Sequence, residues 1–151
     1  MKKLCVLSAS LFLLSASLLA QTNVTWQETN IHFTMPESGV PGEHSENKFE
    51  WNGTTLKVTL YHSKRGFDLK TADQATIRAG KEVGVAKVER EKDIETPTMK
   101  GVYFIGDRAG QKVLFAGLLN PKLKRGLFID IEFEGDKAQV LPILQTFVIE
   151  K

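Results

Sequence analysis

Cysteine is almost absent from this 151-residue sequence, which contains only Cys5. Taking the first 20 residues from 151 leaves 131, and these hold no cysteine. That excludes disulfide bonds, thiol catalysis and cysteine-ligated zinc or iron–sulfur clusters from residues 21–151. This stretch has to be stabilised by a hydrophobic core, and its length suits one compact domain.

Histidine is also scarce, with only His32, His44 and His62 in the chain. No two of them have the short spacing found in zinc motifs. A weak cation site at Glu43–Glu46 is one alternative, but a solvated turn is favoured there. His62 ends the inward side of a strand pattern, which favours a partly buried histidine. The sequence therefore predicts no metal-ligating residue.

Motifs for nucleophilic catalysis and phosphate binding are missing. The three serines after residue 20 lie outside any Gly-x-Ser-x-Gly motif, and no glycine-rich segment has the lysine and hydroxyl spacing of a phosphate loop. Acidic residues alternate along 88–95, but glycosidase chemistry needs two of them in a shielded cleft, so a solvated strand edge is favoured. We predict no catalytic residue, no cofactor-binding residue and no cofactor.

An excess of charge of one sign is lacking as well. The whole chain has twenty basic and eighteen acidic residues, a net charge of +2. Lys2 and Lys3 belong to the first 20 residues, which contain no acid, so eighteen basic residues remain against eighteen acidic ones. A neutral domain gives no electrostatic reason to expect nucleic-acid binding.

The first 20 residues have the pattern of a secretory signal. Lys2 and Lys3 precede the apolar run Leu4–Leu14, which is short for a membrane span, and Ala20 stands at a plausible cleavage position. Cleavage after Ser17 and an uncleaved anchor are the alternatives. We expect a signal peptide at 1–20 and a single α+β domain at 21–151, with no transmembrane segment after cleavage. The short leader is of bacterial type and predicts a periplasmic or secreted location.

The first half of the remaining chain predicts strands. Residues 24–35 alternate in polarity at their end, as a half-buried strand does, and 37–43 are rich in turn formers. Residues 48–51 and 54–62 flank Asn52-Gly53, a pair favoured in tight hairpin turns. We predict a hairpin at this position.

Two helices are predicted, separated by four strands. The first spans about 71–86, with small residues at helical spacing that predict close packing against a sheet. The strands are expected at 88–96, 100–106, 112–119 and 127–134, the first of them a charged edge strand and the last with Asp130 pointing outward. The second helix is expected at 136–147, with Pro142 as a kink or as its true first turn.

These elements predict an α+β fold with a mainly antiparallel sheet of about six or seven strands and two helices. Met35-Pro36-Glu37 ends the opening strand, an apolar hairpin surrounds Gly106–Gly110, and Leu144–Phe147 belongs to the closing helix. This order resembles the PsbP-like fold, an α-β-α sandwich shared by photosystem extrinsic proteins, a Ran-binding import factor and bacterial DcrB-type proteins. The resemblance implies a non-enzymatic accessory or partner-binding role and transfers no functional residue.

Four residues are candidates for contact with a partner: Trp51, Lys122, Lys124 and Arg125. The three basic residues form a small cluster suited to an acidic partner, too small a field for nucleic acid. Trp51 borders the predicted hairpin turn and is a candidate interface anchor if half exposed, although core packing is favoured for it and for Trp26.

The leading functional hypothesis is an exported, non-enzymatic domain that binds a protein or cell-envelope partner. The alternative is a small-molecule or lipid carrier with an apolar pocket between sheet and helix. A third hypothesis is an enzyme of unrecognised type. The sequence specifies neither the identity of the partner nor the oligomeric state.

Overall fold

The computed structural model describes residues 21–63 and 66–151, so the expected signal peptide lies outside the described residues. The helices are α1 Ala72–Glu82 and α2 Leu141–Leu144, each preceded by one 3₁₀ turn, at Leu69–Thr71 and Lys137–Gln139. The strands are β1 Thr22–Trp26, β2 Ile31–Met35, β3 Gly39–His44, β4 Lys48–Gly53, β5 Leu56–Ser63, β6 Ala86–Lys87, β7 Lys92–Glu95, β8 Lys100–Arg108, β9 Gln111–Asn120, β10 Arg125–Phe133 and β11 Val148–Ile149.

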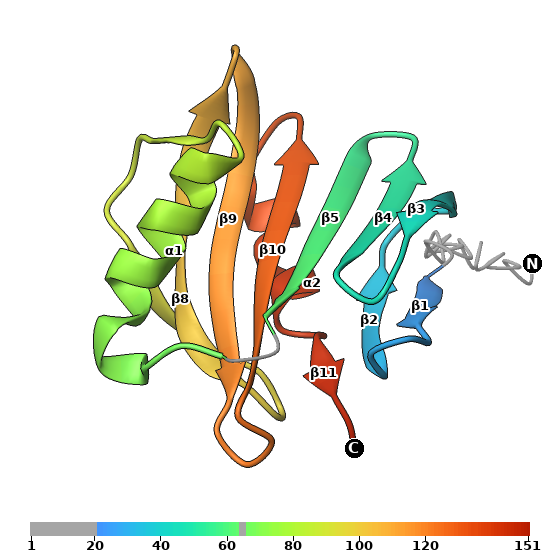
Figure 1. The fold of residues 1–151 in the computed structure, drawn as a ribbon. Helices are drawn as coiled ribbons and strands as arrows, with labels where there is room; N and C mark the ends of the chain where they lie inside the picture. The colour runs from blue at the N-terminus through green and yellow to red at the C-terminus, as the bar shows by residue number, and fades with distance from the viewer. Residues whose placement is uncertain (1–20, 64–65) are drawn as a thin grey trace, which may run out of the picture.

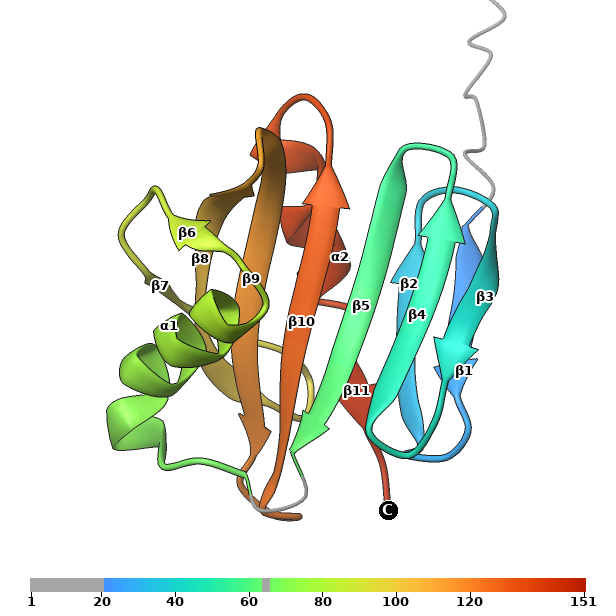
Figure 2. The ribbon, with the colours of Figure 1, turned by 45° about the horizontal axis from the view of Figure 1, so that its top comes forward.

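The strands form two antiparallel sheets. The larger has eight strands in the order β3-β4-β5-β10-β9-β8-β6, with β7 also pairing with β8, and the smaller has the order β1-β2-β11. Helix α1 packs on one face of the large sheet, over β8 and β9 (Figure 1). The small sheet and α2 cover the opposite face (Figure 2). The result is a layered sandwich in which α1 leaves β10, β5 and β4 uncovered on its own side.

The main hydrophobic core lies between the large sheet and the layer of α2 and the small sheet. Its members come from both ends of the chain, because β2 pairs with β1 on one edge and with β11 on the other. Trp26 and Trp51 are both in this core, at 0% and 1% exposed. A second, smaller cluster under α1 contains Phe104 and Phe115. The core environment favoured for the two tryptophans is therefore observed.

The opening strand expected at 24–35 is a hairpin instead. β1 and β2 pair antiparallel, with Trp26 opposite Ile31. Asn30 takes a positive φ of 54°, which asparagine tolerates, and Thr29 donates to the carbonyl of Trp26 at 3.2 Å. The turn-rich segment 37–43 largely becomes strand β3, which has an irregular register against β4. The alternation at 31–35 was extended back over the polar run 27–30, which is the turn.

The hairpin predicted around Asn52-Gly53 is confirmed, but its turn lies two residues later. Asn52 pairs with Lys57, and Gly53 continues β4 opposite Gly39 of β3. The turn at 54–55 is held by the Glu37 carboxylate, which accepts hydrogen bonds from both Thr55 and Leu56. A contact from a distant carboxylate therefore decides where this turn forms.

Helix α1 is shorter than the predicted 71–86. It ends at Glu82, and Gly84 with a φ of +83° takes the chain out of the helix. The predicted close approach to the sheet is confirmed: a Cβ at Gly80 would lie 2.9 Å from Phe104 Cζ. The buried residues of the helix are Ala72, Thr76 and Gly80, which are small residues at four-residue spacing.

The central hairpins agree closely with the sequence. β8 and β9 join at Ala109 and Gly110, both with positive φ, as a two-residue hairpin turn requires. β9 lies between β8 and β10 and is buried over most of its length, which suits its continuous apolar run. Of the edge strand expected at 88–96, only β7 forms, and the two-residue β6 lies just before that range. Asp130, expected to point outward into water, is 1% exposed.

The closing helix is much shorter than the predicted 136–147. Asp136 caps a 3₁₀ turn by accepting from the amide of Ala138, and α2 has Pro142 in its first turn. The second of the two roles considered for this proline is the observed one. The last residues form β11, which the sequence did not predict. The α+β class, the two helices and the antiparallel pairing are observed, but the described residues form eleven strands, eight of them in the large sheet, where a sheet of about six or seven was expected.

Candidate functional site

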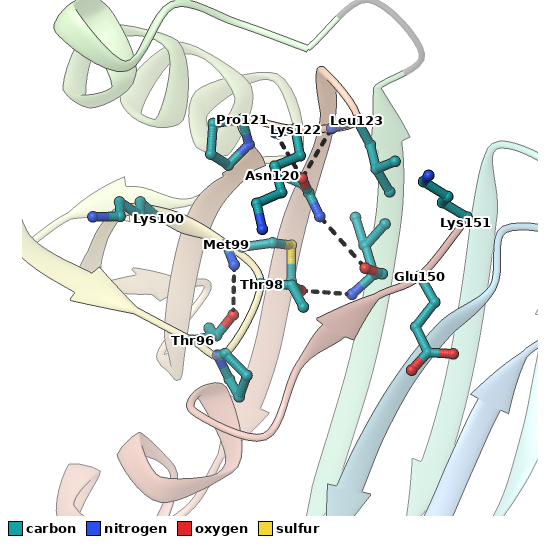
Figure 3. Close-up of a pocket in the computed structure, with 12 residues that line it drawn as sticks. Thr96, Thr98, Met99, Lys100, Asn120, Pro121, Lys122, Leu123, Glu150 and Lys151 are labelled. Atoms are coloured by element: carbon teal, nitrogen blue, oxygen red, sulfur yellow. Dashed lines mark hydrogen bonds between the residues drawn. The ribbon is translucent and has the colours of Figure 1, made fainter.

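The candidate site is a pocket at one end of the large sheet, which we call the end-of-sheet pocket. Three segments that are distant in sequence form it: the connection before β8, the β9–β10 turn and the chain around β11 (Figure 3). It is mainly apolar, opens to the solvent and has a volume of about 420 Å³. Its lining residues are Thr96, Pro97, Thr98, Met99, Lys100, Asn120, Pro121, Lys122, Leu123, Ile149, Glu150 and Lys151.

Asn120 organises the middle of the pocket. Its Oδ1 accepts hydrogen bonds of 3.0 Å from the amides of Lys122 and Leu123, and its Nδ2 donates to the carbonyl of Ile149 at 3.4 Å. The side chain is 4% exposed, so its polar atoms need these partners. Asn120 therefore fixes the β9–β10 turn and joins it to β11.

Thr96 and Thr98 fix the opposite wall. Thr96 Oγ1 accepts from the amide of Met99 at 3.1 Å, which closes the turn before β8. Thr98 Oγ1 accepts from the amide of Ile149 at 3.0 Å. Because Thr98 and Asn120 hold the two main-chain groups of Ile149, all three walls of the pocket share one hydrogen-bonded frame.

Lysine is the main charged residue type around the pocket. Figure 3 shows the Lys122 side chain directed into the pocket toward Met99, while the Lys100 side chain extends away from it. Lys100 forms an ion pair with Glu95 at 3.1 Å. Glu150 is the only acidic lining residue, and its carboxylate lies 3.8 Å from Nε2 of His32, on the side of the small sheet.

The four predicted partner-contact residues are separated by the structure. Lys122 lines the pocket, and Lys124 is exposed beside it in the same turn, with a φ of 52°. Trp51 is buried in the main core, the placement favoured for it, so it is not exposed as an interface anchor: β4 is covered on that side by the small sheet, where Phe33 meets Phe49. Only the two lysines offer free surface for a partner.

Arg125, the fourth candidate, is turned inward. Its Nη2 donates to the carbonyl of Thr29 at 2.6 Å, its Nη1 to the carbonyl of Glu150 at 3.3 Å, and its Nε to Nε2 of His62 at 3.1 Å. Burial lowers the pKa of Arg125. The guanidinium therefore joins the start of β10 to the β1–β2 turn and to the C-terminal segment. The favoured description of His62 as a partly buried histidine agrees with this contact.

Sequence reasoning missed most of the pocket. Thr98, Met99 and Asn120 were not predicted as site residues, because each lies in an ordinary strand or turn context. The one available signal was Asn120-Pro121, since an asparagine side chain before a turn often accepts main-chain hydrogen bonds. Nothing local indicates that this turn would lie beside residues 96–100 and 149–151.

A polar cluster of another kind lies on the face of the large sheet beside α1. Arg108 reaches across β9 to pair with Asp130 and Glu132 of β10, and its Nε donates to the carbonyl of Val83 at 3.1 Å. Burial raises the pKa of Asp130, and the neighbouring guanidinium of Arg108 offsets part of this rise. Because every group in the cluster has a partner within the fold, we assign it to stability.

Within residues 21–63 and 66–151, no group of three or more histidine, cysteine or acidic side chains is placed to hold a metal ion. Among the helices described, none has the length and apolar character needed to cross a membrane.

Comparison with known proteins identifies the fold. No protein-family model matches the sequence, and no curated protein sequence matches it. A crystal structure of the Ran-binding protein Mog1p of Saccharomyces cerevisiae does match, with a TM-score of 0.57 and 14% identity over 87% of this chain and 96% of that one. The fold resembles that of Mog1p. A mutant of Mog1 matches at a TM-score of 0.56, with 14% identity over 86% of this chain and 96% of the other.

These neighbours correct two expectations. They support the PsbP-like resemblance at the level of fold type, through Mog1p, and do not place the chain in the PsbP or DcrB families. They also contradict the predicted periplasmic or secreted location. The matching structure comes from a yeast Ran-binding protein and not from an exported bacterial one, and the leader pattern alone had suggested export.

Proposed function

We propose that this chain is a non-enzymatic binding domain that contacts a protein partner through the end-of-sheet pocket. The observation that carries the proposal is an open, mainly apolar hollow with the Lys122 amine directed into it and Lys124 exposed beside it. Pockets of this kind accept an apolar anchor side chain, while charges around them orient the partner.

Two further observations support a binding role. The walls of the pocket are fixed by Asn120 and Thr98, so little conformational entropy would be lost when a partner enters. The fold is similar to that of Mog1p, which is named as a Ran-binding protein, so this architecture serves protein binding in at least one other chain.

A small-molecule carrier is the second candidate, because about 420 Å³ lies within the usual range for ligand pockets. A carrier site was expected between the sheet and a helix, but no residue of α1 or α2 lines this pocket, and the interface of the large sheet with α1 is closed. That interface is filled: Thr76 is 0% exposed, and Gly80 lies against Phe104 and Phe115.

The test is affinity capture from the cells that produce the protein, with the full tagged chain as bait. Lys122→Glu reverses a charge in the pocket, and Arg78→Glu makes the same change on the exposed side of α1 as a matched control. We expect a protein that is retained by the wild type and Arg78→Glu and lost with Lys122→Glu. Equal capture by all three baits would contradict the proposal. A small molecule found on the purified chain by native mass spectrometry, with no captured protein, would favour the carrier.

A further inference from the structure

We infer that the segment bound by the end-of-sheet pocket is a short acidic peptide stretch that inserts one apolar side chain between β11 and the β9–β10 turn. This inference rests on the proposed binding role and specifies the chemistry of the partner. Three features carry it: the charge around the pocket, its apolar floor and the state of the β11 main chain.

The charge at the pocket is positive, although residues 21–151 as a whole have a net charge of zero. Lys122 and Lys151 line it against the single acidic lining residue Glu150, Lys124 adds an exposed cation beside it, and the charge of Lys100 is paired with Glu95. Figure 3 shows the Glu150 carboxylate directed away from Lys122, which agrees with its position near His32. An incoming acidic side chain would therefore meet the Lys122 ammonium without repulsion from within the pocket.

The floor of the pocket is apolar. Met99 and Ile149 are each 1% exposed and belong to the main core, and Leu123 packs against the same core while remaining partly accessible. Met99 and Ile149 are already buried, so the accessible apolar surface comes from Pro97, Pro121 and Leu123. An apolar side chain placed in the pocket would remove that surface from water, which is the favourable term in such contacts. Purely ionic ligands could not use this surface, so the peptide needs an apolar anchor as well as acids.

The main chain of β11 does not offer a strand edge to a peptide. On the side facing the pocket, the amide of Ile149 donates to Thr98 Oγ1 and its carbonyl accepts from Asn120 Nδ2. Strand addition requires those two groups to be unpaired. Recognition at this pocket therefore depends on side chains of the peptide: one anchor and its flanking acids.

The experiment uses the full chain and a fluorescent heptapeptide in which one leucine has three glutamates on each side. We expect binding by fluorescence anisotropy that weakens with added salt. Lys122→Glu should weaken it about tenfold, since attraction is replaced by repulsion, and Lys122→Met, which keeps the apolar stem, by less. Replacing the leucine of the peptide by glycine should weaken binding about tenfold or more. Arg78→Glu should leave it unchanged.

Amide chemical shifts should change at residues 96–100, 120–123 and 149–151 when the peptide is added. Equal binding to the wild type and Lys122→Glu, equal binding of a peptide with lysines in place of glutamates, or shift changes confined to another surface would each overturn the inference. Failure here together with a captured protein that depends on Lys122 would leave the binding role standing. Peptide binding at the pocket without any captured protein would support the chemistry inferred here, while the capture experiment alone would count against a protein partner in those cells.

Discussion

Arg108 of β8 and Asp130 of β10 form an ion pair across the intervening strand β9, although Asp130 is only 1% exposed. The same guanidinium donates to Glu132 Oε1 at 2.6 Å and to the carbonyl of Val83 at 3.1 Å. A carboxylate buried to this degree needs a charged partner to remain ionised. Arg108 is therefore the residue that makes Asp130 tolerable inside the fold.

Replacing Arg108 by methionine should lower the free energy of unfolding by about 3 kcal/mol, because it leaves an uncompensated buried carboxylate. Urea denaturation at pH 7 measures this. The double variant Arg108→Met with Asp130→Leu is the control, and it should recover most of the loss because no buried charge remains. A double variant as unstable as Arg108→Met alone would show that the loss came from packing.

The effect of Arg108→Met should depend on pH. Burial raises the pKa of Asp130 above its ordinary value of 3.8, so its contribution to stability is greatest below that value and is lost as pH rises through the folded pKa. Without Arg108 the folded pKa rises further, and the loss extends to higher pH. The destabilisation should therefore be larger at pH 7 than at pH 4. Equal values at both pH values would contradict this account.

Glu37 should stabilise the β4–β5 turn in a pH-dependent way. Partial burial acts to raise its pKa, but hydrogen bonds from Thr55 and Leu56 hold the pKa below the usual 4.5. Its stabilising contribution is present above pH 4.5 and is lost as pH falls through the folded pKa. Glu37→Ala should cost about 2 kcal/mol at pH 7, and Glu37→Gln about 1 kcal/mol. Urea denaturation at pH 7 and pH 3 should show the gap between wild type and Glu37→Gln closing at the lower pH.

Gly117 should resist substitution, because it lies under α1. A Cβ there would stand 2.2 Å from Thr76 Oγ1 and 3.1 Å from Phe128 Cε1. Gly117→Ala should destabilise the protein by about 2 kcal/mol, as overpacking of a filled interface does. Thermal unfolding measures this change. In a Thr76→Ala background the same substitution should cost less, and an unchanged cost would point to Phe128 as the obstacle.

Asn120 should determine the order of the end-of-sheet pocket. Asn120→Ala removes three hydrogen bonds from a buried position and should cost about 2 kcal/mol. The amides of Lys122 and Leu123 should then exchange with solvent deuterium faster, as hydrogen exchange by NMR would show. Thr98→Val, which keeps the shape and removes the acceptor, is the matched variant for the opposite wall. It should leave the amides of the β9–β10 turn protected.

Much of the secondary structure follows from the sequence, because strand and turn patterns are local. In β5, Leu56, Val58 and Leu60 occupy every second position and are buried, as the apolar side of a strand is. The hairpin turn at Ala109-Gly110 needs only two residues that accept positive φ. The near absence of cysteine likewise fixed, without any structure, that residues 21–151 are held by their core. The α+β class could be predicted from the sequence because it depends on the same local strand and helix patterns.

The tertiary structure decided everything that depends on which segments become neighbours. Alternation marks Asp130 as facing away from the main core, but only the tertiary structure brings Arg108 to it and leaves it 1% exposed. Trp51 is buried because the small sheet, which includes β11 from the end of the chain, covers β4. The pocket joins residues 96–100, 120–123 and 149–151, and their contacts are long-range, so no local pattern encodes them.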